Sequence, residues 1–363
     1  MSASPFSVEV APDWKGLDAS IRRTRTPSRV HHIELFLDVE VEDAICERYG
    51  VLEGIDPADE HFAFRRRIAL QRFLGYDYVR CGVEGLDLPL KRHATDDTAG
   101  MARRGGRQYM EEHRGPITSW RFFEQFEWPD SWQADTRALE WYEENLPEDM
   151  CVIGGGGFAH FAEHLAWLMG YETLCTSLYD QRDLVEAIAG RLLELNRKIV
   201  ELMVQFDRVK FIWGSDDMGF RSGPLISPDD LRQLVLPGHR LMATIAHEAG
   251  RPYLLHSCGK LDQIMPDLVD NVKIDARHSF EDTIEDVRDA RDRWGDRIAL
   301  LGGIDVDFLC RSGEAAIRER TRRTLEKCMP GGGYCLGTGN SVANYIPLEN
   351  YLAMVDEGRK WSG

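Results

Sequence analysis

The stretch RPYLLHSCGKLDQIMPDL (residues 251–268) changes character twice along its length. It begins as an apolar run, passes through polar residues around His256 and Gly259, and ends in a pattern with helical periodicity. An apolar run followed by a Gly-containing turn and then by a helix is typical of one βα unit. This stretch therefore predicts a strand that lies in a parallel sheet and leads into a helix.

The same pattern recurs along the chain, in eight apolar runs that precede a turn. Most of these runs are apolar throughout instead of alternating, which indicates strands buried on both faces. Eight βα units in a chain of 363 residues predict an α/β fold of the (β/α)8 TIM-barrel type. The predicted strands are residues 31–37, 76–82, 149–155, 208–214, 251–257, 271–276, 297–303 and 332–339.

Residues 83–148 interrupt the pattern, because they are rich in charge, Gly, Trp and Phe and show little periodicity. We expect them to form a long insertion after the second strand, near the barrel mouth, where such loops often cover an active site. A closed barrel can hold more than 250 residues around one core. The prediction is therefore a single domain over residues 1–363, with 83–148 as its insertion.

Composition and charge narrow the class of partner. The net charge of −17 argues against nucleic acid or an anionic membrane as the main partner, which leaves a small molecule or a protein. The N-terminus has no secretion-type apolar segment, and no run of 18 apolar residues occurs. Eight cysteines are scattered without CxxC pairs, which indicates reduced thiols. We therefore expect a soluble, cytoplasmic protein.

Polar residues follow the predicted strands where each apolar run stops, and in a barrel of this type the C-terminal strand ends carry the active site. The adjacent carboxylates of Asp216 and Asp217 suit either a helix start or cation binding and proton transfer. His278 and Asp305 suit either a site or a loop cap. As catalytic candidates we take Asp217, Glu84, His278 and Thr338, and as substrate-binding candidates Glu34, Asp216, Asp305 and Asn340.

His256 and Cys258 form the candidate metal site. Alternate residues of a strand share a face, so the two side chains point the same way. A thiolate and an imidazole together suit zinc, which usually needs at least one more protein ligand. The competing interpretation is a hydrogen-bonded histidine beside a buried thiol.

Two other patterns favour a structural role. Gly154–Gly157 is not a phosphate-binding motif, since it lacks the following Lys, and close backbone packing at the barrel rim is expected there. His160 and His164 stand four apart but lack the Glu of HExxH, and His31 and His32 point to opposite faces of a strand.

With these residues in hand the chain resembles the uroporphyrinogen decarboxylase superfamily, a (β/α)8 group that also contains cobalamin-dependent methyltransferases. The resemblance is carried by LLHSCGKLDQIMPDLVD (254–270), ALLGGIDVDFL (299–309), GYCLGTGNSVANYIPLENYLAMVDEGR (333–359) and IWGSDDMGF (212–220). It covers the C-terminal half strongly and the N-terminal half by strand order.

The methyltransferase branch binds zinc through His-x-Cys and a distant Cys in a Gly-Cys-Gly turn. His256 and Cys258 match the first two ligands, whereas Thr338 replaces the third. A threonine hydroxyl is a poor zinc ligand beside a thiolate, so Asp217, Glu84 or Cys335 would have to complete the site. The resemblance implies a zinc enzyme that activates a small-molecule thiol or hydroxyl, with a corrinoid carried by a separate protein.

The decarboxylase branch fits less well. It carries an Arg-rich N-terminal motif, whereas the first strand here reads HHIELFLDVE, and its last Gly-His-Gly turn is also replaced at Thr338. The alternatives to a methyltransferase are a metal-free decarboxylase or lyase acting on a small acidic molecule, and a small-molecule-binding barrel without catalysis.

Overall fold

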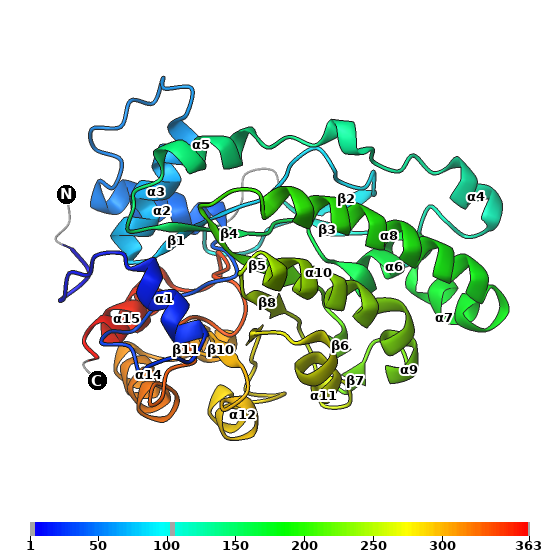
Figure 1. Cartoon of the computed structure of the whole chain (residues 1–363). Coiled ribbons are helices and arrows are strands. Elements are labelled where there is room, and N and C mark those ends of the chain that lie inside the picture. The colour runs from blue at the N-terminus through cyan, green and yellow to red at the C-terminus, as the bar shows by residue number, and fades with distance from the viewer. Residues whose placement is uncertain (1–3, 102–105, 362–363) are drawn as a thin grey trace.

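Seven parallel strands form the central sheet of the computed structural model, which describes residues 4–101 and 106–361. Their order in space follows their order in the chain, as in a barrel. This arrangement confirms the predicted α/β class (Figure 1). The strands are β1 (Tyr78–Cys81), β4 (Cys151–Gly154), β5 (Val209–Ser215), β8 (Tyr253–His256), β9 (Ala276–His278), β10 (Ala299–Leu301) and β11 (Tyr334–Cys335).

The first predicted strand, residues 31–37, takes the eighth position without forming a regular strand. On one side His32 makes an isolated parallel bridge to Leu336, beyond β11. On the other side the backbone N–H of Glu34 donates to the Tyr78 hydroxyl of β1, at 2.9 Å. A side chain thus takes the place of backbone pairing next to β1, so the predicted eighth strand is an irregular segment.

The boundaries predicted for the sixth strand, residues 271–276, lie too far toward the N-terminus. Its first residues belong to a helical turn, Leu268–Val272, that ends at Lys273 with a φ of 65°. The apolar residues Val272 and Ile274 are buried, yet an apolar run of this length does not distinguish a strand from the packed end of a helix. The strand itself, β9, is Ala276–His278.

Helices surround the sheet (Figure 1). Helix α1 (Trp14–Ile21) closes the N-terminal end of the barrel, where Trp14 N–H donates to the carbonyl of Asp149 and Ser20 accepts from Gly333 N–H. The other barrel helices are α2 (Val39–Tyr49), α3 (Phe62–Leu74), α5 (Arg137–Asn145), α6 (Phe161–Met169), α7 (Tyr171–Asp180), α8 (Arg182–Met203), α9 (Pro228–Asp230), α10 (Leu236–Glu248), α11 (Met265–Asp267), α12 (Val287–Trp294), α13 (Val306–Arg311), α14 (Glu314–Cys328) and α15 (Leu348–Arg359).

The segment between β1 and β4 leaves the barrel and returns to it at neighbouring residues. The backbones of Glu84 and Asp135 pair there in an isolated antiparallel bridge. Between these two residues lie the hairpin β2–β3 (Arg92–Thr95, Arg107–Met110) and the short helix α4 (Trp120–Gln125) (Figure 1). Helix α5 follows the bridge and leads into β4. Residues 102–105 of the segment lie outside the described part of the chain.

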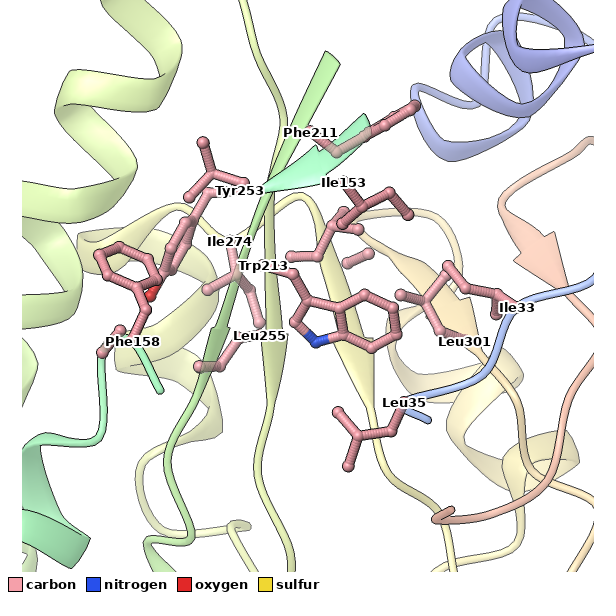
Figure 2. Close-up of a cluster of buried hydrophobic side chains, with 14 of the residues drawn as sticks. Ile33, Leu35, Ile153, Phe158, Phe211, Trp213, Tyr253, Leu255, Ile274 and Leu301 are labelled. Atoms are coloured by element: carbon pink, nitrogen blue, oxygen red, sulfur yellow. The ribbon is translucent and has the colours of Figure 1, made fainter. Parts of the chain in front are cut away.

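Apolar side chains from several strands fill the interior, among them Ile33, Ile153, Trp213, Leu255 and Leu301 (Figure 2). Burial of each such side chain contributes about 1.5–3 kcal/mol to the stability of the fold. The packed layers therefore account for the fold, and the polar residues at the strand ends are free for other roles. None of the helices in the described part of the chain has the length and apolar character needed to cross a membrane.

Candidate metal centre

Three side chains of different chemistry meet beyond the C-terminal ends of β5 and β8. The His256 Nε2 atom lies 3.3 Å from Asp217 Oδ1 and 3.4 Å from Cys258 Sγ. All three potential ligand atoms lie within 4.8 Å of one another. Bond lengths of about 2.0–2.3 Å at a tetrahedral zinc imply ligand atoms about 3.5 Å apart. The triad of Asp217, His256 and Cys258 thus has the spacing and the N, O and S donors that suit zinc.

The pairing of β5 with β8 positions the triad. Ser215 is in register with His256, and Asp216 N–H continues the pairing with a 2.9 Å hydrogen bond to the His256 carbonyl. The next carboxylate, Asp217, accepts from Cys258 N–H at 2.8 Å. Two strand ends thus bring residues 41 apart in sequence into contact.

Two glycines allow the loops after β5 and β8 to touch. A Cβ atom on Gly259, whose φ is 85°, would lie 2.2 Å from the backbone carbon of Gly219. A Cβ on Gly219 would lie 2.9 Å from the carbonyl oxygen of Cys258. Both contacts are shorter than real Cβ atoms tolerate, so only glycine lets Asp217 and Cys258 approach each other here.

His278 of β9 stands behind His256, with 2.7 Å between their Nδ1 atoms. Burial, and then the neighbouring His256, lower the pKa of His278 well below its usual value, so His278 is neutral. A neutral His278 can accept a hydrogen bond at Nδ1 from His256 Nδ1. His256 Nε2 faces Asp217 Oδ1 as a hydrogen-bond donor, and loss of its Nε2 proton would expose a lone pair between Asp217 and Cys258.

The charge state of the triad favours a bound cation. Burial opposes ionisation of Asp217, but hydrogen bonds from His256 and from the backbone and side chain of Cys258 outweigh it and lower its pKa to about 2. Burial, and then the charge of Asp217, raise the pKa of the Cys258 thiol. A carboxylate beside a thiol that ionises only when a cation stabilises it is the electrostatic environment of a metal site.

Asn340 and Ser279 surround the sulfur atom. Asn340 Nδ2 donates to Cys258 Sγ at 3.3 Å, and Ser279 Oγ lies 3.8 Å from it. Hydrogen bonds to a thiolate stabilise the charged form. Asn340, predicted as a substrate contact, thus lies against the proposed ligand Cys258.

Thr338 interacts with Glu34 and not with the triad. Its hydroxyl lies 2.6 Å from Glu34 Oε2, its N–H donates to Oε1 at 2.8 Å, and its hydroxyl is 3.2 Å from the Asn340 carbonyl. Burial raises the pKa of Glu34 to about 8, although both Thr338 hydrogen bonds oppose this. A neutral Glu34 can donate to the Thr338 hydroxyl, which then donates to Asn340. The pair thereby anchors the loop that carries Asn340.

The remaining predicted residues have other surroundings. Asp216 is fully buried, accepts from the N–H groups of Ala162 and Glu163 at the start of α6, and lies 2.9 Å from His239 Nε2. Asp305 caps α13 by accepting from Phe308 N–H. These contacts are structural.

The other two candidates for the third ligand lie elsewhere. Glu84 is exposed, and Cys335 is fully buried on β11. Within the described residues, the group of side chains that could hold a metal is the triad of Asp217, His256 and Cys258.

Three residues near the site were not predicted from the sequence. Glu163 Oε2 accepts from Asp217 N–H at 3.1 Å and lies 2.5 Å from His160 Nδ1. A cavity of about 650 Å³ is lined by Arg80, Glu84, His160 and Ser215 among others, and Ser215 is in register with His256. The spacing of His160 and Glu163 in a helix was the available signal, whereas nothing in the sequence marked Arg80.

Comparison with known proteins gives a family and a fold. Residues 113–361 match the protein-family model described as uroporphyrinogen decarboxylase (URO-D). Over 96% of this chain and 98% of the other, the structure also resembles the solved structure of a methyltransferase from Methanosarcina mazei, with a TM-score of 0.65 at 19% identity. At this identity the likeness supports the fold alone.

Similarity to curated proteins is confined to short stretches. A methylated-thiol–coenzyme M methyltransferase from Methanosarcina mazei is 34% identical over 135 residues, which is 37% of this chain and 34% of that protein. A uroporphyrinogen decarboxylase from Bordetella petrii is 39% identical over 75 residues, 20% of this chain and 21% of that protein. The chain thus matches about a third or less of the length of these two relatives.

Proposed function

The chain belongs to the uroporphyrinogen decarboxylase (URO-D) family, and from this premise we propose that it is a methyltransferase of that family whose metal site activates a small-molecule thiol or hydroxyl. The observation that carries the proposal is the contact of Asp217, His256 and Cys258 at the barrel mouth. The partial match to a methyltransferase that acts on methylated thiols supports the same branch.

Zinc is the metal that this donor set suits, with Asp217, His256 and Cys258 as its protein ligands. When bound, zinc supplies a Lewis acid that lowers the pKa of a thiol or hydroxyl placed in the remaining position. Asp217 would replace the cysteine that the resemblance led us to expect at Thr338. The anionic carboxylate and thiolate together balance a dication.

The surrounding residues of the chain orient and tune these ligands. His278 accepts a hydrogen bond from Nδ1 of His256 and so fixes the ring that presents Nε2. Asn340 donates to Cys258 Sγ and stabilises its thiolate, which is the form of cysteine that binds a metal. Glu163 accepts from Asp217 N–H and holds the loop that carries this carboxylate.

The methyl group would come from a corrinoid carried by a separate small protein, as the resemblance to the methyltransferase branch implies. The acceptor would be a small molecule in the cavity that Ser215 and His160 line. The cytoplasmic location predicted from the scattered cysteines remains a prediction.

A second candidate function is a metal-free decarboxylase or lyase. The short match to a uroporphyrinogen decarboxylase favours it, as does the family description. Two observations argue against the decarboxylase. The segment of residues 31–37 carries a buried acidic residue, Glu34. Cys258 also lies beside two other types of metal-binding side chain. Zinc content separates this candidate from the methyltransferase, and an assay of transfer separates both from a barrel that only binds.

Methyl transfer from methylcobalamin to a small thiol, with zinc-loaded protein, tests the proposal. We expect His256→Ala and Cys258→Ser to abolish transfer and to leave the fold intact, because strand-end residues contribute little to the packed layers of the barrel. Cys310→Ser and His247→Ala, which change partly exposed residues outside the triad, should retain activity. Unfolding of the His256 and Cys258 variants would favour a structural pair, and full activity in them would refute the proposed site.

A further inference from the structure

Arg80 is a cation on the wall of the 650 Å³ cavity, and it has no acidic partner among the residues that the structure describes. Its side chain is partly buried at the C-terminal end of β1. One guanidinium nitrogen, Nη1, donates to the carbonyl of Leu35, and the group lies over the Trp213 ring, 4.5 Å from the ring centre. Within residues 4–101 and 106–361, no Asp or Glu forms an ion pair with it.

Among the described residues, Arg80 is one of several partly or fully buried arginines without an ion pair; Arg359, for example, donates to the carbonyls of Val8 and Phe73. Arg277, which is also buried, pairs with Glu285 at 2.6 Å, as expected for a charge removed from water. Burial lowers the pKa of Arg80 to about 10, so the side chain still carries its charge at neutral pH. Arg80 lines the cavity, and the described residues give its guanidinium one hydrogen-bond acceptor, the Leu35 carbonyl.

A second arginine stands beside it. Arg67 of α3 is exposed, lines the same cavity and donates to the backbone carbonyl of Arg80 at 3.3 Å. The acidic wall residues Glu84 and Asp87 are exposed to water and form no ion pair with either arginine in the described part of the chain. The basic charge is therefore available to a ligand.

We propose that Arg80, assisted by Arg67 at the rim, binds an oxyanion group (a carboxylate, a sulfonate or a phosphate) carried by the substrate. The planar fork of a guanidinium matches two oxygens of such a group, and an ammonium does not. That this anion belongs to the methyl-transfer substrate rests on the proposed function.

The position of Arg80 relative to the triad supports this assignment. The Trp213 ring under Arg80 meets His278 edge-on, with 5.7 Å between ring centres, and His278 contacts His256. Ser215 lines the same cavity as Arg80 and is in register with His256 of the triad.

Calorimetric titration of the full-length protein tests the anion site without requiring metal. The probes are propionate, ethanesulfonate and inorganic phosphate, which distinguish the three oxyanion classes, with propionamide as the neutral control. We expect one of the three anions to bind with 1:1 stoichiometry and propionamide not to bind. Arg80→Gln should weaken that binding at least tenfold and Arg67→Gln less, since Arg67 is exposed.

Arg240→Gln is the matched control, because Arg240 lies exposed on α10 and its loss changes the net charge equally. It should bind the anion as tightly as the wild type does. Binding of none of the three anions by the wild type, or equal affinity in the wild type and Arg80→Gln, would overturn the proposal. If Arg80→Gln does not fold, Arg80→Lys decides, since it keeps the charge and loses the fork. Weaker binding in the Lys variant supports the proposal, and unchanged binding contradicts it.

Zinc affinity, measured on the same proteins, separates this inference from the proposed function. We expect Arg80→Gln to bind zinc as the wild type does. Anion binding that depends on Arg80, in a protein that binds no zinc, would keep the anion site and refute the metal-dependent function. Zinc binding without any anion binding would refute the anion site and leave the metal-dependent function standing.

Discussion

Asp216 and Asp217 are adjacent in sequence, yet the fold gives their carboxylates different partners. Asp216 turns inward to the first turn of α6 and to His239, while Asp217 turns toward Cys258 and His256. Successive residues beyond a strand end face opposite ways, so one carboxylate stabilises the fold and the other is available to a metal.

Glu34 provides a test at the scale of a single residue. Its pKa rises from an ordinary 4.5 to about 8 on folding, through burial that the Thr338 hydrogen bonds only partly offset. Between these two pH values the folded protein holds one more proton than the unfolded chain. The free energy of unfolding therefore falls as pH rises through this window, and this contribution is constant outside it.

Glu34→Gln should remove the fall in the free energy of unfolding at high pH. A glutamine amide can accept from Thr338 N–H and donate to the Thr338 hydroxyl, as the neutral acid does. We expect the variant to exceed the wild type in stability at pH 8.5 by on the order of 3–5 kcal/mol, and to match it near pH 4.5. Urea unfolding at several pH values measures this, with Glu84→Gln, an exposed carboxyl, as the control. Parallel pH profiles for the wild type and Glu34→Gln would show that Glu34 is ionised in the folded protein.

Sequence reasoning reached His256 and Cys258 because both lie on one strand end, where spacing alone predicts that they share a face. It left three residues open for the third ligand, since Asp217, Glu84 and Cys335 all lie at or near strand ends. The choice depends on contacts between loops that are distant in the chain. Arg80 was missed for a similar reason, because the absence of a partner is a property of the folded protein.

At the scale of elements, the loops after β5 and β8 determine whether a metal site exists. Gly219 and Gly259 let these loops meet, and the hydrogen bonds from Asp216 and Cys258 N–H join them. Strand order could be predicted from apolar runs, but this contact could not, because it needs two backbones to approach without side chains. The same limit applies to residues 31–37, where a tyrosine hydroxyl replaces regular pairing with β1.

Gly259→Ala tests the contact between the loops. The new methyl group would meet the Gly219 backbone and would also force an alanine to a φ of 85°, at a cost of about 1–3 kcal/mol. We expect a lower melting temperature and zinc binding weakened at least tenfold. Gly223→Ala should leave both unchanged, because Gly223 lies in the short hairpin β6–β7 (Gly219–Phe220, Gly223–Pro224) with open space around its Cα. Wild-type zinc affinity in Gly259→Ala would mean that the loops can separate without loss of the site.

At the scale of the whole molecule, the barrel and its site are largely independent. The core is a continuous apolar cluster inside the sheet, whereas the triad lies beyond the strand ends. We propose that residues 1–363 act as one domain, in which residues 83–148 help to enclose the mouth.

Chelation of the metal should therefore leave the secondary structure unchanged, as followed by far-UV circular dichroism. It should lower the melting temperature, because zinc at a thousand times its Kd stabilises the folded state by about 4 kcal/mol. Asp217→Asn should show a much smaller drop. Unfolding on chelation would instead make the metal a structural requirement of the barrel.

Zinc affinity, determined by competition with a chromophoric chelator, tests the central claim that Asp217, His256 and Cys258 form a metal site. We predict one zinc per wild-type chain, at least about tenfold weaker binding in Asp217→Asn, and unchanged binding in Glu84→Gln. Thr338→Cys should not tighten zinc, because Thr338 is held by Glu34 and not by the triad. Failure of the wild type to bind zinc would contradict the account, as would undiminished binding in Asp217→Asn with tighter binding in Thr338→Cys.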